Sequence, residues 1–309
     1  MSRLRAVLGL VKFSHSIFAL PFALAGAWLA AAGPPRLATL GWIVLAAVAA
    51  RTAAMAFNRL VDRHIDAANP RTVGRELPRG AMRPAAVGAL VLVAAGVFIG
   101  AAFALGPVPG WLAPPVLVVL LGYSYVKRFS AAAHFVLGLA LALAPLGAWV
   151  AVRGAIEGPL APVLWLALAV WTWVAGFDLI YACQDVDFDR ARGLHSVPAR
   201  LGVQRALALS RALHVVTVVA LTLVGLSAGL GAVYFGAVAF VAALLVYEQR
   251  LVQPDDFSRV DLAFFTVNGW VGVALFLGLA VDLALHVPGR LAPAGSAVGV
   301  ALSLLGGGR

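Results

Sequence analysis

The sequence predicts an all-α integral membrane protein with nine transmembrane helices. Of its 309 residues, 62% are hydrophobic and 12% are charged, and the mean hydropathy is +0.97. A soluble domain carries about 25% charged residues. Apolar runs close to the ~20 residues that cross a bilayer as a helix recur from Phe13 to His286. Because backbone polar groups within lipid must be satisfied internally, a helical bundle is favoured throughout.

The predicted spans are separated by short connections, and the fourth and eighth spans are short. They cover residues 13–32, 37–57, 85–105, 111–126, 131–152, 161–183, 206–229, 231–247 and 262–286. We interpret the first run as a retained span, because it is longer than the apolar part of a cleavable signal peptide. The whole chain, 1–309, is expected to be one transmembrane domain, with a core at about 10–287 and a tail at 288–309.

The formal net charge of +10 could indicate nucleic-acid binding, but the positions of the charges indicate membrane topology instead. With a cytoplasmic N-terminus, Arg51 falls within a span and the outer side carries only Arg36, Arg153, Arg290 and Arg309. The remaining lysines and arginines fall on the cytoplasmic side. The positive-inside rule therefore places the N-terminus in the cytoplasm and the C-terminus outside, in the inner (plasma) membrane. Membrane lipid is the expected partner of the basic charge, and no nucleic acid is expected.

Two acidic clusters lie at the ends of the second and sixth spans. Their members recur at intervals of three or four residues, so that each cluster would form one stripe on a helix face. The stripes are Asn58, Asp62 and Asp66, and Asp178, Tyr181, Asp185 and Asp189. Carboxylates this close repel one another, and a divalent cation relieves the repulsion. Magnesium takes one or two carboxylates and completes its shell with phosphate oxygens and water, so the stripes suit Mg²⁺ carrying a diphosphate.

The single cysteine, Cys183, excludes an intrachain disulfide and a cysteine metal cluster. A solvated helix end would explain one acidic cluster but is a poor explanation of two matched ones. Four cations near the clusters could hold phosphate, since arginine binds it bidentately and lysine acts as a point charge. They are Arg71, Arg75, Lys127 and Arg128, for which positive-inside anchoring is the alternative explanation.

Arg51 lies midway along an otherwise apolar span, where a charge is costly and indicates function. It precedes Asn58 by two helical turns and could bind the carboxylate of an acceptor, or pair with an interior acid. Asp178, interpreted as the only acid deep in a span, could pair with Arg51, ligate the metal or hold the region around Tyr181. His15 is the one histidine expected near a cavity. Interface or helix-end positions are expected for His64, His134, His195, His214 and His286.

These motifs resemble those of the UbiA-type intramembrane prenyltransferases. The resemblance rests on the spaced Asn58, Asp62 and Asp66, the stretch from Arg71 to Pro78, the run Tyr125-Val126-Lys127-Arg128, and the spaced Tyr181, Asp185 and Asp189. The stretches from Lys12 to Phe22 and from Asp178 to Asp185 are similar to the quinone-pathway branch, the 4-hydroxybenzoate polyprenyltransferases.

The resemblance implies nine helices around a central cavity capped by two cytoplasmic loops. Magnesium diphosphate would lie between the acidic clusters, with Asn58, Asp62 and Asp185 as the catalytic residues. Arg75, Lys127 and Arg128 would hold the leaving group, with Arg71 beside them, and Arg51 would meet the carboxylate of an aromatic acceptor. Asp187 lies off the stripe and is placed outside the metal site. His15, Asp178 and Tyr181 are further candidates for contact with the acceptor.

The implied activity is transfer of a polyprenyl group from a prenyl diphosphate to a ring carbon of an aromatic acceptor. The acceptor would resemble 4-hydroxybenzoate or a dihydroxynaphthoate, in ubiquinone or menaquinone biosynthesis. Two alternatives remain: an ion-coupled transporter that uses Asp178 and Arg51, and an enzyme like the CDP-alcohol phosphotransferases. Transporters place polar sites at the bilayer midplane, whereas most acids here gather at one face. The sequence leaves open the prenyl chain length, the acceptor and the oligomeric state.

Overall fold

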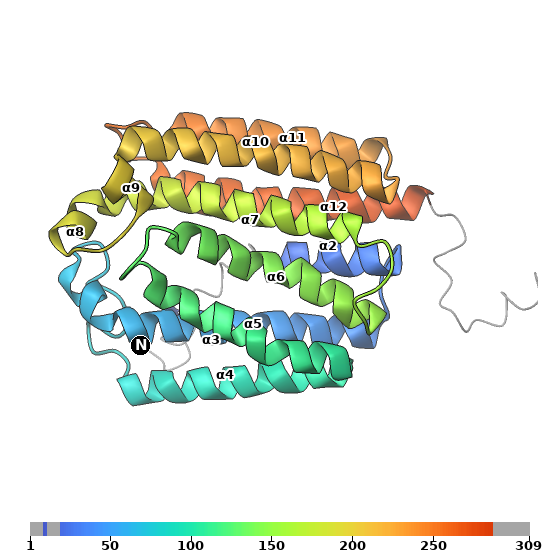
Figure 1. Cartoon of the computed structure of the whole chain (residues 1–309), viewed down its shortest axis with the longest axis horizontal. Coiled ribbons are helices and arrows are strands. Elements are labelled where there is room, and N and C mark those ends of the chain that lie inside the picture. Colours follow the sequence, from blue (N-terminus) through green and yellow to red (C-terminus); the bar gives the residue numbers. More distant parts are fainter. Residues whose placement is uncertain (1–8, 11–18, 287–309) are drawn as a thin grey trace, which may run out of the picture.

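The structure is a computed structural model that describes residues 9–10 and 19–286. In this part of the chain it is a helical bundle without β-strands, apart from an isolated bridge between Gln253 and Asp256. The long helices lie side by side with roughly parallel axes (Figure 1). Eight of them are long and apolar enough to span a membrane. The predicted all-helical membrane fold is therefore confirmed.

The long helices correspond to the predicted spans. They are α2 (Leu20–Ala31), α3 (Leu37–Ala68), α4 (Pro84–Leu105), α5 (Pro107–Val126), α6 (Ala133–Arg153), α7 (Ala161–Ala182), α10 (Val203–Ala228), α11 (Ala232–Leu251) and α12 (Asn268–His286). Four short segments connect them: the 3₁₀ turn η2 (Cys183–Asp185), α8 (Val186–Ala191), α9 (Val197–Leu201) and the π-helical η3 (Leu262–Val267). Of the first predicted span, α2 is the described part, and residues 13–18 and the tail lie outside the described residues.

The second predicted span ends too early. The charges after Phe57 suggested its end, but α3 continues to Ala68 and carries the whole first acidic cluster. It stops at Asn69, whose backbone is extended (φ −94°, ψ 121°), because the following Pro70 disfavours a helical conformation in the residue before it. α3 and α7 run to the same end of the bundle, where α8 and α9 lie (Figure 1). We call this the acidic end.

Close helix packing builds the centre of the bundle. α7 is buried along most of its length, and Trp149 of α6 and Trp173 of α7 belong to the largest apolar cluster. A Cβ atom on Gly26 of α2 would lie 2.4 Å from the carbonyl oxygen of Pro145 on α6. The backbones of α2 and α6 can therefore approach as they do only because position 26 has no side chain, as expected for small residues between membrane helices.

Buried polar groups link the helices at two further places. Asn268 of α12 donates to Glu248 Oε1 of α11 (2.8 Å) and accepts from Trp173 Nε1 of α7 (2.7 Å), so it joins three helices. The interpretation of Asp178 as the only acid deep in a span is wrong, because Asp282 of α12 is fully buried. Its carboxylate accepts from the backbone N–H groups of Gly231 (2.7 Å) and Tyr234 (3.1 Å) and so caps α11.

Asp282→Ala is expected to destabilise the protein by about 2–3 kcal/mol, because one buried and one partly buried backbone donor lose a charged acceptor. Thermal unfolding in detergent measures the loss. Asp282→Asn, which keeps one acceptor oxygen, should lose less. If Asp282→Ala unfolded at the same temperature as the wild type, the cap would contribute nothing to stability.

Candidate active site

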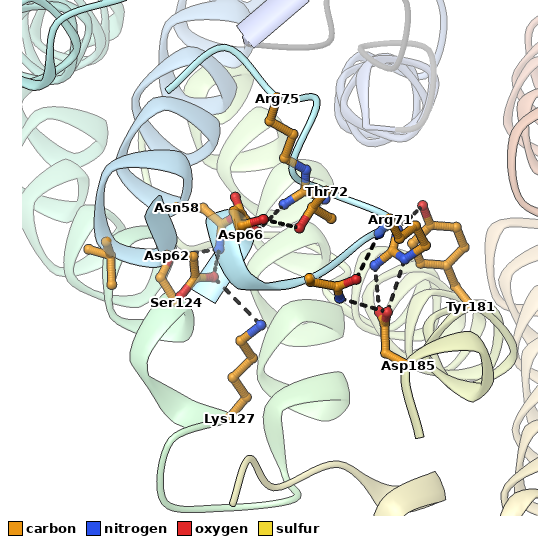
Figure 2. Close-up of polar contacts among 12 residues, drawn as sticks. Asn58, Asp62, Asp66, Arg71, Thr72, Arg75, Ser124, Lys127, Tyr181 and Asp185 are labelled. Carbon is orange, nitrogen blue, oxygen red and sulfur yellow. Dashed lines mark hydrogen bonds and ion pairs between the residues drawn. The ribbon is translucent and has the colours of Figure 1, made fainter. Parts of the chain in front are cut away.

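Both acidic clusters line one cavity of about 670 Å³ at the acidic end of the bundle. The helices α3 and α7 supply the carboxylates, and α5, α6 and the connection after α3 supply most of the remaining polar wall. Side chains far apart in the sequence thus face one another across this polar cavity (Figure 2). A shared cavity is what the two clusters need in order to act as one site.

Asp62 is held by groups from α5 and the turn that follows it. Arg128 Nη2 donates to Asp62 Oδ1 (2.9 Å), and Lys127 Nζ lies 3.8 Å from Oδ2. Asn58 Nδ2 donates to the same Oδ2 (3.1 Å) and lies 3.4 Å from Ser124 Oγ. Asp62 is therefore joined directly to two of the predicted phosphate-binding cations, and Asn58 is joined to Asp62.

Asp66 lies one turn further along α3. Arg75 Nη1 donates to its Oδ1 (2.6 Å), and the Thr72 hydroxyl donates to its backbone carbonyl (2.9 Å). The other carboxylate oxygen, Oδ2, is buried and has no hydrogen-bond partner among the described residues. Burying a carboxylate oxygen without a partner costs free energy, so Asp66 Oδ2 is suited to coordinate a cation.

Asp185 connects the second cluster to the segment after α3. Arg71 pairs with both of its oxygens, and Asn69 Nδ2 donates to Oδ1 (3.0 Å). Arg71 also donates to the Tyr181 hydroxyl (2.7 Å) and lies over the Tyr181 ring (Figure 2). Burial is the largest single influence on the pKa of Arg71 and lowers it, but the hydrogen bond to Asp185 and the nearby charges of Tyr181, Asp185 and Asp66 together raise the pKa above its ordinary value. Arg71 therefore remains a cation.

The second stripe is not one continuous helix face. α7 ends at Ala182, the 3₁₀ turn η2 holds Asp185, and Asp189 lies on the separate helix α8. The prediction of a single helical stripe from Asp178 to Asp189 is wrong in this respect, although all its members line the polar cavity. Asp189 is buried and is hydrogen-bonded to Ser196, which caps α9.

The polar cavity fits a hard divalent cation by the chemistry of its donors. It offers carboxylate and amide oxygens, which magnesium prefers, and the orphaned oxygen of Asp66 is among them. Within the described residues, no three His, Cys, Asp or Glu side chains are already gathered as a ligand set. Each carboxylate of Asp62, Asp66 and Asp185 instead pairs with an arginine. Those arginines are the cations that a diphosphate would attract.

A second, apolar cavity of about 190 Å³ continues into the bundle between α2, α3, α4, α5 and α6. Met55, Tyr123 and Leu137 line both cavities, so the two adjoin. Alanines form much of the apolar wall, and Arg51 is the charged residue among its lining. Arg51 Nε is buried and has no hydrogen-bond partner within the described part of the chain.

The structure separates the alternatives for Asp178. Its Oδ2 lies 2.7 Å from His134 Nδ1, so its partner is His134 and not Arg51. Sequence reasoning placed His134 at an interface or helix end and missed this contact, because α6 and α7 meet only in the fold. Arg59 was also missed: it was counted as a cytoplasmic anchor, yet it is 6% exposed and lines the polar cavity. His15 lies outside the described residues.

Comparisons with known proteins agree with this geometry. Residues 19–302 match the UbiA prenyltransferase family. The 4-hydroxybenzoate octaprenyltransferase of Aeromonas hydrophila is 33% identical over 256 residues, which cover 82% of this chain and 87% of that one. The enzyme of the same name from Aromatoleum aromaticum is 32% identical over 260 residues, covering 82% and 85%.

Solved structures share the fold. The apo structure of a UbiA homologue from Aeropyrum pernix K1 has a TM-score of 0.79 at 36% identity and covers 87% of this chain and 98% of its own. A UbiA homologue from Archaeoglobus fulgidus bound to DMAPP and Mg²⁺ has a TM-score of 0.67 at 17% identity, covering 89% and 99%. The family match over most of the length and the relatives above 30% identity lead to one conclusion. The chain is a multi-pass membrane enzyme and belongs to the UbiA prenyltransferase family.

Proposed function

We propose that the protein transfers a polyprenyl group from a prenyl diphosphate to a ring carbon of an aromatic carboxylate acceptor, with Mg²⁺ bound to the diphosphate. The observation that carries the proposal is the polar cavity, where two acidic clusters meet Arg71, Arg75 and Lys127. It adjoins an apolar cavity lined by Arg51, whose Nε has no hydrogen-bond partner among the described residues. The related octaprenyltransferases act on 4-hydroxybenzoate by their names, and the Archaeoglobus fulgidus homologue binds DMAPP and Mg²⁺.

The metal would be held by oxygen atoms on both walls. Asn58, Asp62 and Asp66 would supply them from α3, and Asp185 and Asp189 from the end of α7 and from α8. Bound there, Mg²⁺ neutralises charge on a departing diphosphate. The orphaned Asp66 Oδ2 supports this assignment, because a cation would remove the cost of burying it unpaired.

The leaving group would be bound by cations that now contact the carboxylates. Arg75, Lys127 and Arg128 approach from the first cluster, and Arg71 approaches from the second. Each is partly exposed, with 24–37% of its side chain accessible, so it can turn from a carboxylate to a phosphate oxygen. Tyr181 lies against Arg71 and would orient it. Its main role would therefore be to position Arg71, and contact with the acceptor would be a lesser one.

The acceptor would lie between the diphosphate and Arg51. Arg51 precedes Asn58 by seven residues, which is a rise of about 10 Å along α3. An aromatic ring whose carboxylate binds Arg51 would therefore extend toward Asn58 and the reacting carbon of the donor. An acceptor carboxylate would give Arg51 Nε the partner that it lacks among the described residues. The apolar walls exclude water, which would otherwise capture the allylic cation. We place the chain in the inner membrane with its N-terminus in the cytoplasm, from the positive-inside distribution.

The alternatives are disfavoured by the same geometry. In an ion-coupled transporter, Arg51 and Asp178 would form a coupling pair, but Asp178 pairs with His134. A CDP-alcohol phosphotransferase gathers its acids on one helix pair, whereas here two distant clusters meet across a cavity.

Asp62→Ala and Asp185→Ala are each expected to lower turnover by at least about 10³-fold in detergent with added magnesium, because the metal loses a ligand and the charge on the leaving group is left uncompensated. Product formation from a prenyl diphosphate measures the rate. Asp187→Ala is the matched control: Asp187 is exposed, lies between the two metal-ligand candidates and should keep near-normal turnover. Near-normal rates in either of the first two variants would remove the metal role.

The acceptor is tested by supplying membranes with a prenyl diphosphate and either 4-hydroxybenzoate or 1,4-dihydroxy-6-naphthoate, and by identifying the products by mass. We expect a C-prenylated carboxylate product. Arg51→Ala should raise the KM for that acceptor by about 10²-fold and leave the KM for the donor unchanged, since only the acceptor carboxylate loses its partner.

Arg51→Lys, which keeps the charge, should recover part of the acceptor affinity. If Arg51→Ala altered only the saturation by prenyl diphosphate, the carboxylate assignment would be wrong. If wild-type membranes prenylated neither acceptor, the proposed activity itself would fail.

A further inference from the structure

Arg59 is a cation that lines the polar cavity without being paired to a carboxylate. The other cations in the lining each form an ion pair with an aspartate of the acidic clusters; they are Arg71, Arg75 and Lys127. No described residue forms an ion pair with Arg59, and its buried Nε has no hydrogen-bond partner among them. Arg59 therefore has a free charge where its neighbours have used theirs.

Burying this charge costs free energy that no direct partner offsets. Only 6% of Arg59 is exposed, although α3 is long and apolar enough to span a membrane. A buried guanidinium needs a counter-charge and hydrogen bonds to replace the water that it has lost. An apolar residue at this position would avoid the cost, and a charge kept within a membrane helix indicates function. We therefore interpret Arg59 as a binding group for an anion that comes from outside the protein.

The charges around Arg59 indicate which anion this is. Among the described residues, Arg75 acts on Arg59 more strongly than any other charged group, and the two guanidinium groups repel each other. Asp66 attracts Arg59 but forms its ion pair with Arg75, and Asp66 Oδ2 is also buried without a hydrogen-bond partner in this part of the chain. A metal ion at Asp66 that carries a phosphate oxygen toward Arg59 would satisfy both groups.

The position of Arg59 on α3 agrees with this arrangement. Asp62 and Asp66 follow it by three and seven residues, so the three side chains share one face of the helix. Guanidinium groups bind phosphate bidentately, and a phosphate has enough oxygens for Arg59 and Arg75 together. The anion that fits is thus a phosphate of the donor. The carboxylate of the acceptor already has a proposed partner in Arg51.

We propose that Arg59 is a diphosphate-binding residue and the first cation to contact the donor. This inference rests on the proposed function. A phosphate oxygen can bind Arg59 without breaking an ion pair, whereas the other cations in the lining must first separate from their carboxylates. They reach the remaining phosphate oxygens when those carboxylates bind the metal. The allylic carbon–oxygen bond then breaks with its electron pair left on the diphosphate oxygen, and Arg59 stabilises the added negative charge.

The test measures binding of geranyl S-thiolodiphosphate, an unreactive donor analogue, to the full chain in detergent by isothermal titration calorimetry. The wild type should bind it with magnesium and, more weakly, in EDTA. Arg59→Met should lower the affinity by about 10–100-fold with magnesium, the loss expected for hydrogen bonds between charged groups, and should abolish binding in EDTA. Arg59→Lys, which keeps the charge, should recover part of the affinity.

Two results of this titration would overturn the proposal. Equal affinities of Arg59→Met and the wild type would remove Arg59 from the diphosphate site. Absence of wild-type binding in EDTA, with binding in magnesium retained, would show that Arg59 is not the first contact of the donor.

Arg63 provides the matched control. It is an arginine of the same helix, four residues after Arg59, but it donates to the Leu60 carbonyl and does not line the polar cavity. Arg63→Met should keep the wild-type affinity both with magnesium and in EDTA. A loss equal to that of Arg59→Met would show that removing any positive charge from α3 weakens binding, which contradicts a specific contact with Arg59.

Thermal unfolding without donor separates a binding role from a structural one. Arg59→Met replaces an unpaired buried charge by an apolar side chain, so it should unfold at the temperature of the wild type or above it. The rise in unfolding temperature on adding the analogue should be smaller than in the wild type, because binding is weaker. A lower unfolding temperature without donor would show that the fold itself needs Arg59 and would overturn the proposal.

Steady-state kinetics distinguish the two substrates. Arg59→Met should raise the KM for the prenyl diphosphate and lower kcat, and should leave the KM for the acceptor unchanged. A rise confined to the KM for the acceptor would assign Arg59 to the acceptor and contradict its role at the diphosphate. If the wild type formed no prenylated product, the proposed function would fail, while the titration with the analogue would still decide the role of Arg59.

Discussion

The site depends on balancing buried charge at the acidic end of a membrane bundle. Carboxylates brought together in a low-dielectric cavity repel one another, and each must have a counter-charge. Arginines from the segments after α3 and α5 supply it for Asp62, Asp66 and Asp185. The pairing of Arg71 with Asp185 also joins the end of α3 to the end of α7, as does the hydrogen bond from Asn69. The carboxylate–arginine pairs thus stabilise the fold at this end. A bound metal diphosphate would replace them with contacts of the metal to the carboxylates and of the phosphates to the arginines.

The depth of the site follows from two long helices with the same direction. α3 carries its charges on its last turns and Arg51 further in, and α7 carries Asp178 before the helix gives way to η2 and α8. Polar chemistry is thereby kept at one end, while small side chains leave an apolar cavity next to it. A substrate with a charged head group, a reactive carbon and an apolar tail fits a polar cavity that adjoins an apolar one. This explains why such an enzyme works within a bilayer.

Local sequence signals predicted the spans and the acidic clusters well, because hydropathy and four-residue spacing act within a single helix. They failed where tertiary contacts decide. α7 ends at Ala182 with no proline or glycine beside it, so the local sequence did not predict the 3₁₀ turn η2. His134 resembled an ordinary interfacial histidine, and its pairing with Asp178 needed the crossing of α6 and α7. Asp282 was overlooked in an apolar run, although it caps α11 from the neighbouring helix. Arg59 was predicted to be a cytoplasmic anchoring charge, but it is buried and lines the polar cavity.

We propose that the two acidic clusters together bind one metal-bound diphosphate between them. A structure determined with magnesium and an unreactive thiolodiphosphate analogue of the donor tests it most directly. We expect diphosphate density in the polar cavity, with metal ions in contact with Asp62 on one side and Asp185 on the other. Arg71 and Arg75 should have turned from the carboxylates to the phosphates. Diphosphate bound elsewhere, or metal held by only one cluster while the other keeps its arginine pairs, would contradict it.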